Sequence, residues 1–178
     1  GRTEHGGICA GSAVRPMGRA VEITDYGTRE LTPPLVTIGL TAFNSAGTIE
    51  RALRTALTQT WRPIEVVAVD DCSTDGTSDI LERLAGQHPE LRVFGNVING
   101  GVAVSRNRIL AEARGEFVAF FDDDDESLPE RIVLQWARIV DYERDFASGA
   151  RVICHTARRV IYSGSESIEP TMGQNEGR

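Results

Sequence analysis

Four short apolar runs, separated by segments of helical periodicity, constrain the fold of this chain more than any other feature of its sequence. The runs are Leu35–Leu40, Ile64–Val69, Leu91–Phe94 and Phe117–Phe121. Runs of this length with few polar residues are typical of strands buried on both faces of a parallel sheet. Because a helical pattern follows each run, the order predicts an α/β domain, with a mostly parallel sheet and helices on both faces.

The segments between the runs carry the signals that begin helices. Apolar residues recur at helical spacing over about 49–60, 80–84, 102–113 and 132–140. Ser45 is expected to cap the first helix, and Ser127 with Glu130 to form a capping box before the last one. Val152–Cys154 and Arg159–Tyr162 predict one further strand or a hairpin.

The 178 residues suit one ordinary domain, with a different composition at each end of the chain. Residues 1–34 contain Gly, Pro and Arg with little periodicity, and we expect an extended arm or linker that is a candidate surface for self-association. Residues 35–162 form the predicted domain. Residues 163–178 are polar and rich in Gly, Ser and Glu, which predicts a flexible tail.

Composition argues against several classes of function. The 26 acidic residues outnumber the 19 basic ones, and the net charge of −7 argues against nucleic-acid binding through phosphate contacts. All 19 basic residues are Arg, which removes Schiff-base catalysis and a phosphate-loop lysine. No apolar run of the sequence approaches the ~20 residues that a membrane-spanning helix needs.

Cysteine usage and the first residues bear on the cellular compartment. Cys9, Cys72 and Cys154 are an odd number, lie far apart and include no CxxC, so they indicate neither a disulfide framework nor a zinc site. The first residues lack the apolar segment of a secretory signal. We therefore expect a cytoplasmic protein, either free or peripheral at the membrane.

Acidic residues follow two of the apolar runs directly. Asp122–Asp125 come after Phe121, and Asp70-Asp71 end the second run. Ligands of such sheets bind at the carboxyl ends of the strands, where four close carboxylates repel one another. A divalent cation would offset the repulsion, and hard oxygen ligands suit Mg²⁺ or Mn²⁺, which in turn could hold a diphosphate. The alternatives are a solvated acidic loop and, for Asp70-Asp71, an acid pair at a helix N-terminus.

Two further segments belong to the same predicted edge of the sheet. Thr41-Ala42-Phe43-Asn44 ends the first run and offers Phe43 as an aromatic face for a base; the alternative is a simple strand-to-helix turn. Arg106 lies on a helix that begins near this edge and could face a pyrophosphate; the alternative is a surface arginine.

At these residues the chain resembles the nucleotide-binding half of a family 2 glycosyltransferase, whose Rossmann-like domain has the GT-A fold. The matching motifs are Val36–Asn44, Gln59–Trp61, Val67–Thr77, Asn99–Gly101 with Ser105–Asn107, and Gly115–Asp125. Each motif alone is modest, but their order and spacing together make a specific match over residues 35–162.

The resemblance implies roles for particular residues. Thr41, Ala42, Phe43 and Asn44 would contact the nucleotide. The family usually has Pro at Ala42 and Tyr at Phe43, so the ring is kept and the hydroxyl is lost. Asp71 would accept a hydrogen bond from the pyrimidine base. Asp122-Asp123-Asp124 resembles the DxD motif, in which Asp124 would bind the metal, Mn²⁺ or Mg²⁺, and Asp122 would lie near the ribose or sugar of the donor.

The resemblance also implies a reaction. A sugar would move from a nucleotide-diphosphate donor, most commonly a UDP-sugar, to a saccharide, lipid or protein acceptor, with inversion and a carboxylate base. The family takes that base from a later motif in the acceptor-binding half. The sequence contains no such motif, so no base is assigned, and we expect the acceptor half to be missing from it.

Three other classes of protein are alternatives to a glycosyltransferase. A non-catalytic module that binds a nucleotide sugar, or a scaffold, is the main alternative to an enzyme. A receiver-type signalling domain also groups aspartates at strand ends, but that class needs a lysine near its phospho-acceptor, and this chain has no lysine. A dinucleotide-binding domain would have GxGxxG after the first run, which this chain lacks.

Overall fold

The computed structural model describes residues 33–147, 153–154, 158–162 and 165–169. The predicted arm therefore lies outside the described residues, apart from Pro33 and Pro34. Within the described part no helix combines the length and the apolar character needed to cross a membrane.

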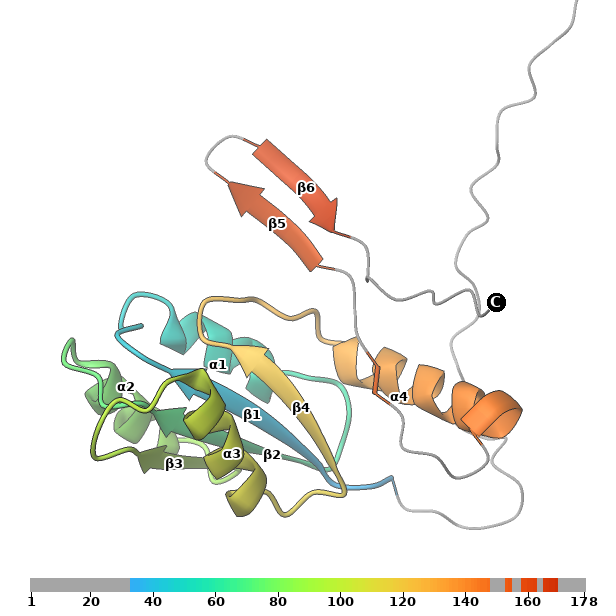
Figure 1. Cartoon of the computed structure of the whole chain (residues 1–178), viewed down its shortest axis with the longest axis horizontal. Helices are drawn as coiled ribbons and strands as arrows, with labels where there is room; N and C mark the ends of the chain where they lie inside the picture. Colours follow the sequence, from blue (N-terminus) through green and yellow to red (C-terminus); the bar gives the residue numbers. More distant parts are fainter. Residues whose placement is uncertain (1–32, 148–152, 155–157, 163–164, 170–178) are drawn as a thin grey trace, which may run out of the picture. The chain divides into compact units, whose positions relative to one another are not determined.

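Four parallel strands form the central sheet, as the apolar runs predict (Figure 1). They are β1 (Val36–Ala42), β2 (Ile64–Asp70), β3 (Leu91–Gly95) and β4 (Phe117–Asp122). The strand order is β3-β2-β1-β4, so β1 has β2 on one side and β4 on the other. In register, Thr41 lies opposite both Val69 and Asp122, which brings the carboxyl ends of β1, β2 and β4 to one edge.

Helices cover both faces of the sheet, which confirms the predicted fold class. On one face α1 (Ile49–Leu57) and α2 (Thr77–Ala85) place Leu53 and Leu81 in the main core, and α4 (Arg131–Tyr142) adds Ile132. On the other face α3 (Val102–Glu112) packs Ile109 on Val67 and Val69 (Figure 1). A Cβ at Gly39 would collide with the Ile109 side chain, so glycine in β1 lets α3 approach the sheet closely.

A buried carboxylate ties the opposite, amino-terminal edge of the sheet together. The Glu65 Oε1 atom accepts hydrogen bonds from the Thr37 hydroxyl and the Arg114 backbone N–H, both at 2.6 Å, and Arg92 lies 3.3 Å from Oε2. Burial by itself raises the pKa of Glu65, but these donors and the Arg92 charge outweigh it and hold the pKa below its ordinary value. Glu65 therefore fixes the turn that leads from α3 into β4.

Both predicted helix caps are wrong. The N-cap residue of α1 is Thr48, because residues 46–48 make one more turn first; Ser45 instead accepts the Thr48 and Ile49 N–H groups on its backbone carbonyl. Ahead of α4 no capping box forms, and the Ser127 hydroxyl accepts a hydrogen bond from Arg131 at 2.8 Å.

The structure contains a hairpin, but of the two predicted segments only Arg159–Tyr162 takes part in it. Strand β5 (Arg158–Tyr162) pairs antiparallel with β6 (Ser165–Glu169). Strand β6 lies in the part of the chain for which a tail is predicted, and residues 153–154 do not form a strand. Ile168 is the only aliphatic residue of β6, so no apolar alternation announces this strand.

Candidate functional site

A cavity of about 260 Å³ lies at the carboxyl ends of β1 and β4. Its lining residues are Thr41, Ala42, Phe43, Asp71, Val102, Ser105, Asp122, Asp123 and Asp124. The chain runs from β1 to β2 on one side, while β4 lies on the other side of β1, so the cavity is at the point where the strand order reverses. Seven of the predicted site residues meet here. Val102, from α3, lies in no matched motif, whereas Ser105 lies in the matched motif Ser105–Asn107 but received no predicted role.

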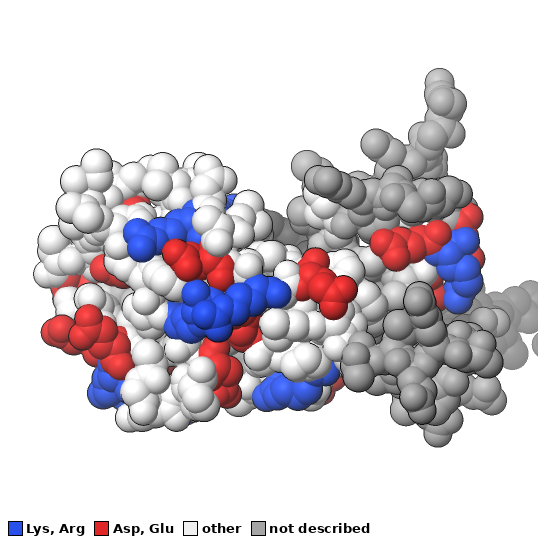
Figure 2. Space-filling view, turned by 90° about the horizontal axis from the view of Figure 1, so that it is seen from below, with Lys and Arg blue, Asp and Glu red and all other residues white. Residues whose placement is uncertain are grey.

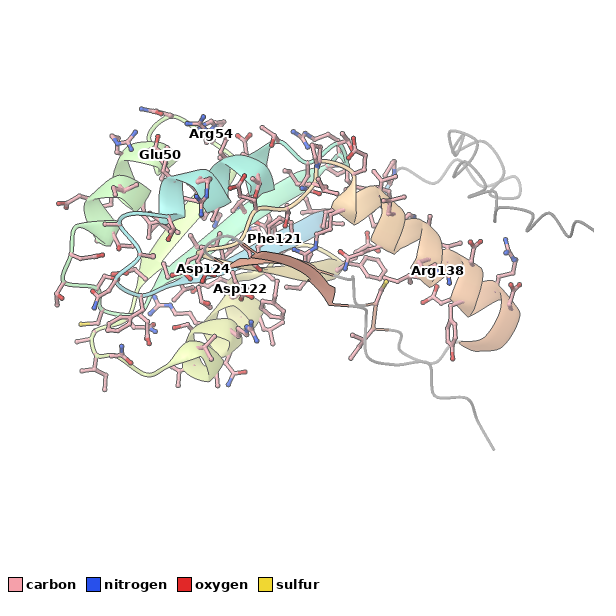
Figure 3. All side chains as sticks on the ribbon, turned by 90° about the horizontal axis from the view of Figure 1, so that it is seen from above. Glu50, Arg54, Phe121, Asp122, Asp124 and Arg138 are labelled. Carbon is pink, nitrogen blue, oxygen red and sulfur yellow. The ribbon has the colours of Figure 1, made fainter. Side chains whose placement is uncertain are left out.

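The carboxylates of the acidic segment, Asp122–Asp125, have different surroundings; Figure 3 labels Asp122 and Asp124, which follow Phe121 at the end of β4. Asp122 forms an ion pair with Arg106 at 3.1 Å. The Asp123 carboxylate accepts the backbone N–H of Phe43 at 3.2 Å, which joins the ends of β1 and β4. Within the described residues no hydrogen bond or ion pair involves the Asp124 carboxylate, which is exposed. This carboxylate is therefore accessible to a ligand from solvent.

Arginine residues offset the negative charge of the acidic segment. Arg106 does not line the cavity, but its guanidinium pairs with Asp122 and lies 5.3 Å from the centre of the Phe120 ring. The Arg131 guanidinium stacks 4.2 Å from the centre of the Phe121 ring and donates to the Phe120 carbonyl at 2.9 Å. Burial lowers the pKa of Arg131, and the charges of Asp122 and Asp125 partly counter this effect. Sequence reasoning missed Arg131, because an arginine at a helix start has no recognisable motif.

The face in Figure 2 shows the same intermixing of charge. Blue Arg side chains lie directly beside red Asp and Glu side chains, and no extended basic area appears among the described residues of this face.

Asp71 is buried at the end of β2 and holds the loop that leads into α3. Its Oδ1 atom accepts from the Asn96 amide at 2.7 Å and the Gly100 N–H at 3.0 Å, and its Oδ2 atom accepts from the Gly101 N–H at 2.7 Å. Burial by itself raises the pKa of Asp71, but these hydrogen bonds outweigh it and lower the pKa. The Asp71 side chain thus stabilises the amino end of α3, as an acid at a helix N-terminus does. It also lines the cavity.

Asn44 lies outside the cavity lining and connects two loops. Its backbone has a left-handed φ of 49°, a conformation that Asn tolerates better than most residues. Its Oδ1 atom accepts the Thr74 N–H at 2.9 Å, and its own N–H donates to the Ser73 hydroxyl at 2.9 Å. The structure therefore gives Asn44 a part in shaping the β1 loop, and the predicted nucleotide contact stays a prediction.

Among the described residues that line the cavity, aspartates supply the carboxylates that could bind a metal ion, and no His or Cys lies there. Across the described part of the chain, no three His, Cys, Asp or Glu side chains come close enough to hold an ion by themselves. The exposed Asp124 carboxylate nevertheless fits a Mg²⁺ or Mn²⁺ ion that takes its remaining ligands from water and from a bound phosphate, as these hard cations commonly do.

Comparison with known proteins gives a consistent result over most of the described domain. The model of the family "Glycosyl transferase family 2" matches residues 37–177. The chain is 37% identical over 102 residues to the putative teichuronic acid biosynthesis glycosyltransferase TuaG of Bacillus subtilis, covering 57% of this chain and 40% of the relative. It is 38% identical over 119 residues to the succinoglycan biosynthesis protein ExoO of Rhizobium meliloti, covering 67% and 32%.

Solved structures give the same result in three dimensions. TarS of S. aureus in complex with UDP superposes with a TM-score of 0.54 and 35% identity, covering 61% of this chain and 32% of that one. The mannosyltransferase PcManGT of Pyrobaculum calidifontis, in complex with GDP-Man and Mn²⁺, gives a TM-score of 0.55 and 34% identity, covering 65% and 34%. The chain covers only 32–40% of the length of these four proteins.

Proposed function

The chain belongs to glycosyltransferase family 2 and has its GT-A fold, and from this premise we propose that it binds a nucleotide-diphosphate sugar together with a divalent cation and takes part in sugar transfer. One observation carries the proposal. Three carboxylates of the acidic segment and the ring of Phe43 line one cavity where the strand order reverses. Ligands of α/β sheets bind where the strand order reverses, and a carboxylate there can hold a divalent cation that also binds the phosphates of the ligand.

The nucleotide is the first part of the proposed ligand. Phe43 is 47% exposed at the cavity, so its ring is available to stack on a base. Asp71 lines the same cavity, and four protein donors, including the Ser105 side chain, already reach its carboxylate. A base N–H would therefore share an Asp71 oxygen with one of these donors. UDP is the ligand of one structural neighbour, so a UDP-sugar is the proposed donor.

The cation and diphosphate are the second part. We assign Asp124 as the metal ligand, because its carboxylate is exposed and directed to no protein partner in the described residues. A bound divalent cation would neutralise the negative charge that develops on the departing diphosphate. Asp122 and Asp123 would contact the ribose or sugar side of the donor, and Arg106, paired with Asp122, would lie near the pyrophosphate. A cation also accompanies the nucleotide sugar in the neighbour with GDP-Man.

The proposed reaction is displacement at the sugar with inversion, onto a saccharide, lipid or protein acceptor. The nucleophile of such a step loses its proton to a carboxylate base. No described residue is assigned as that base. Cytoplasmic location and self-association through residues 1–34 stay predictions from the sequence.

Isothermal titration with UDP, GDP and TDP, each with and without Mn²⁺, tests the proposal. We expect UDP to bind with measurable heat only when Mn²⁺ is present. Asp124→Ala should abolish this metal-dependent binding and leave the domain folded, whereas Asp79→Ala, which removes one exposed charge from α2, should bind as the wild type does. Equal binding by Asp124→Ala and the wild type would remove the proposed metal role.

A panel of nucleotide sugars separates an enzyme from a non-catalytic module. Metal-dependent release of the nucleoside diphosphate, by transfer or hydrolysis, would support the enzyme. Tight binding without any release would favour the binding module instead.

A further inference from the structure

The connection between β4 and α4 lies along one side of α1, which it follows closely in Figure 1. Three polar residues, Arg51, Thr55 and Gln59, face this connection. They are spaced four residues apart, so they lie in one row along α1 and its C-terminal turn. We call them the α1 polar row.

The first two members of the row hold the start of the connection. The Arg51 guanidinium donates to the Asp124 carbonyl at 3.4 Å and forms an ion pair with Glu126 at 3.0 Å. The Thr55 hydroxyl accepts the Ser127 N–H at 3.2 Å. The contacts therefore begin at the proposed metal ligand itself.

Gln59 holds the end of the connection, and its side chain is 1% exposed. Its Nε2 atom donates to the Leu128 carbonyl at 2.9 Å and the Thr55 carbonyl at 3.1 Å. Its Oε1 atom accepts the Ile132 N–H at 3.2 Å. Both ends of one buried amide are thus used to join α1 to the chain on either side of the start of α4.

These contacts place the acidic segment between two fixed ends. On one side Asp122 is paired in register with Thr41 of β1. On the other side the chain from Ser127 onward is bonded to α1 and its C-terminal turn. The Asp124 carboxylate projects from the short stretch between, so its position depends on both ends. Binding sites lose affinity when their supporting groups allow such a stretch to move.

We propose that Gln59 and Thr55 are positioning residues for binding of the metal–nucleotide donor, acting through the backbone of residues 124–132. The inference rests on the proposed function, since it concerns the same donor site. Neither side chain lines the cavity, so any effect on the donor must pass through the connection. Motif matching singled out Gln59-Thr60-Trp61 without giving Gln59 a role.

The test compares two variants of the full chain with a matched control. Thr55→Val keeps the shape of the side chain and removes the acceptor for Ser127. Gln59→Met keeps the length of the side chain and removes all three of its hydrogen bonds. Thr58→Val is the control, because within the described chain the Thr58 hydroxyl donates to the Arg54 carbonyl at 2.8 Å and makes no bond to the connection.

Each protein is titrated with UDP and Mn²⁺ well below its melting temperature, and amide hydrogen exchange is followed over residues 124–132. We expect the Kd to rise about tenfold for Gln59→Met and severalfold for Thr55→Val, with the number of binding sites unchanged, because one buried hydrogen bond corresponds to roughly a tenfold change in equilibrium. Exchange over 124–132 should become faster in both variants. Thr58→Val should match the wild type in both measurements.

A merely structural role gives a different pattern. Fewer binding sites with a Kd within about twofold of the wild type would mean that the variants only unfold more readily, and this result overturns the inference, as does unchanged exchange over 124–132. Failure of the proposed function is distinguishable, because the wild type itself would then give no heat with UDP and Mn²⁺.

Discussion

Replacing Asp71 by Asn separates the two roles that the structure gives this residue. The substitution keeps the size of the side chain but exchanges one acceptor oxygen for an NH₂ group. In its best orientation the amide oxygen still accepts from Asn96 and Gly100, while the NH₂ group faces the Gly101 N–H. Two donors then point at each other at the start of α3.

The expected loss of stability follows from these three contacts. One donor left without an acceptor costs about 1–3 kcal/mol, and the two remaining bonds each lose about 1 kcal/mol of charge assistance. Water offsets part of this loss because Gly101 is only partly buried. We therefore expect the free energy of unfolding at pH 7 to fall by about 2–4 kcal/mol.

Urea denaturation as a function of pH is the assay. The pKa of Asp71 in the folded chain is below its ordinary value of 3.8, so its charge stabilises the fold fully above that pH, and the stabilisation is lost as the pH falls through the folded-state pKa. The free energies of unfolding of the wild type and Asp71→Asn should therefore differ most near neutral pH and become similar in acid below pH 3.8. Equal stability at pH 7, or a difference that does not change with pH, would refute the reasoning.

Three further variants test other parts of the molecule. Glu65→Gln should lower the free energy of unfolding by about 2–4 kcal/mol at pH 7 and much less in acid, because the pKa of Glu65 is lowered in the folded chain; urea denaturation at both pH values measures this. Gly115→Ala should destabilise the fold by about 2–3 kcal/mol in thermal unfolding, since its Cβ would lie 2.6 Å from the Thr37 backbone nitrogen; an unchanged melting temperature would contradict this. Phe43→Leu should weaken UDP binding roughly fivefold, as expected for loss of about 1 kcal/mol of ring stacking, without changing the melting temperature; equal affinity in calorimetry would exclude the base platform.

The sequence predicted the elements whose signals are local and strong. Each apolar run became a parallel strand, and the aspartates after Phe121 reached the edge of the sheet because β4 lies beside β1. The predictions of the helix caps failed because a serine near a helix start does not show whether the chain makes another turn before the helix begins. Strand β6 was missed because backbone pairing with β5, and not apolar periodicity, defines it.

The site was predicted as a set of residues, but their partners were not. Asp71 and Arg106 were expected to face a ligand, and the structure adds protein partners that the sequence did not predict, the α3 loop for Asp71 and Asp122 for Arg106. Gln59 donates to the Leu128 carbonyl, 69 residues along the chain, and Arg131 donates to the Phe120 carbonyl, 11 residues before it. Contacts of this kind depend on how α1 and β4 are placed, so no pattern within either segment could announce them.

The location of the donor is the central claim, and a crystal structure of the full chain with UDP and Mn²⁺ tests it most directly. We predict the diphosphate and the cation at the carboxyl ends of β1 and β4, with Asp124 bound to the metal and the uracil against Phe43 and Asp71. Clear density for UDP at another place, or an acidic segment that contacts only water at saturating ligand, would contradict the account.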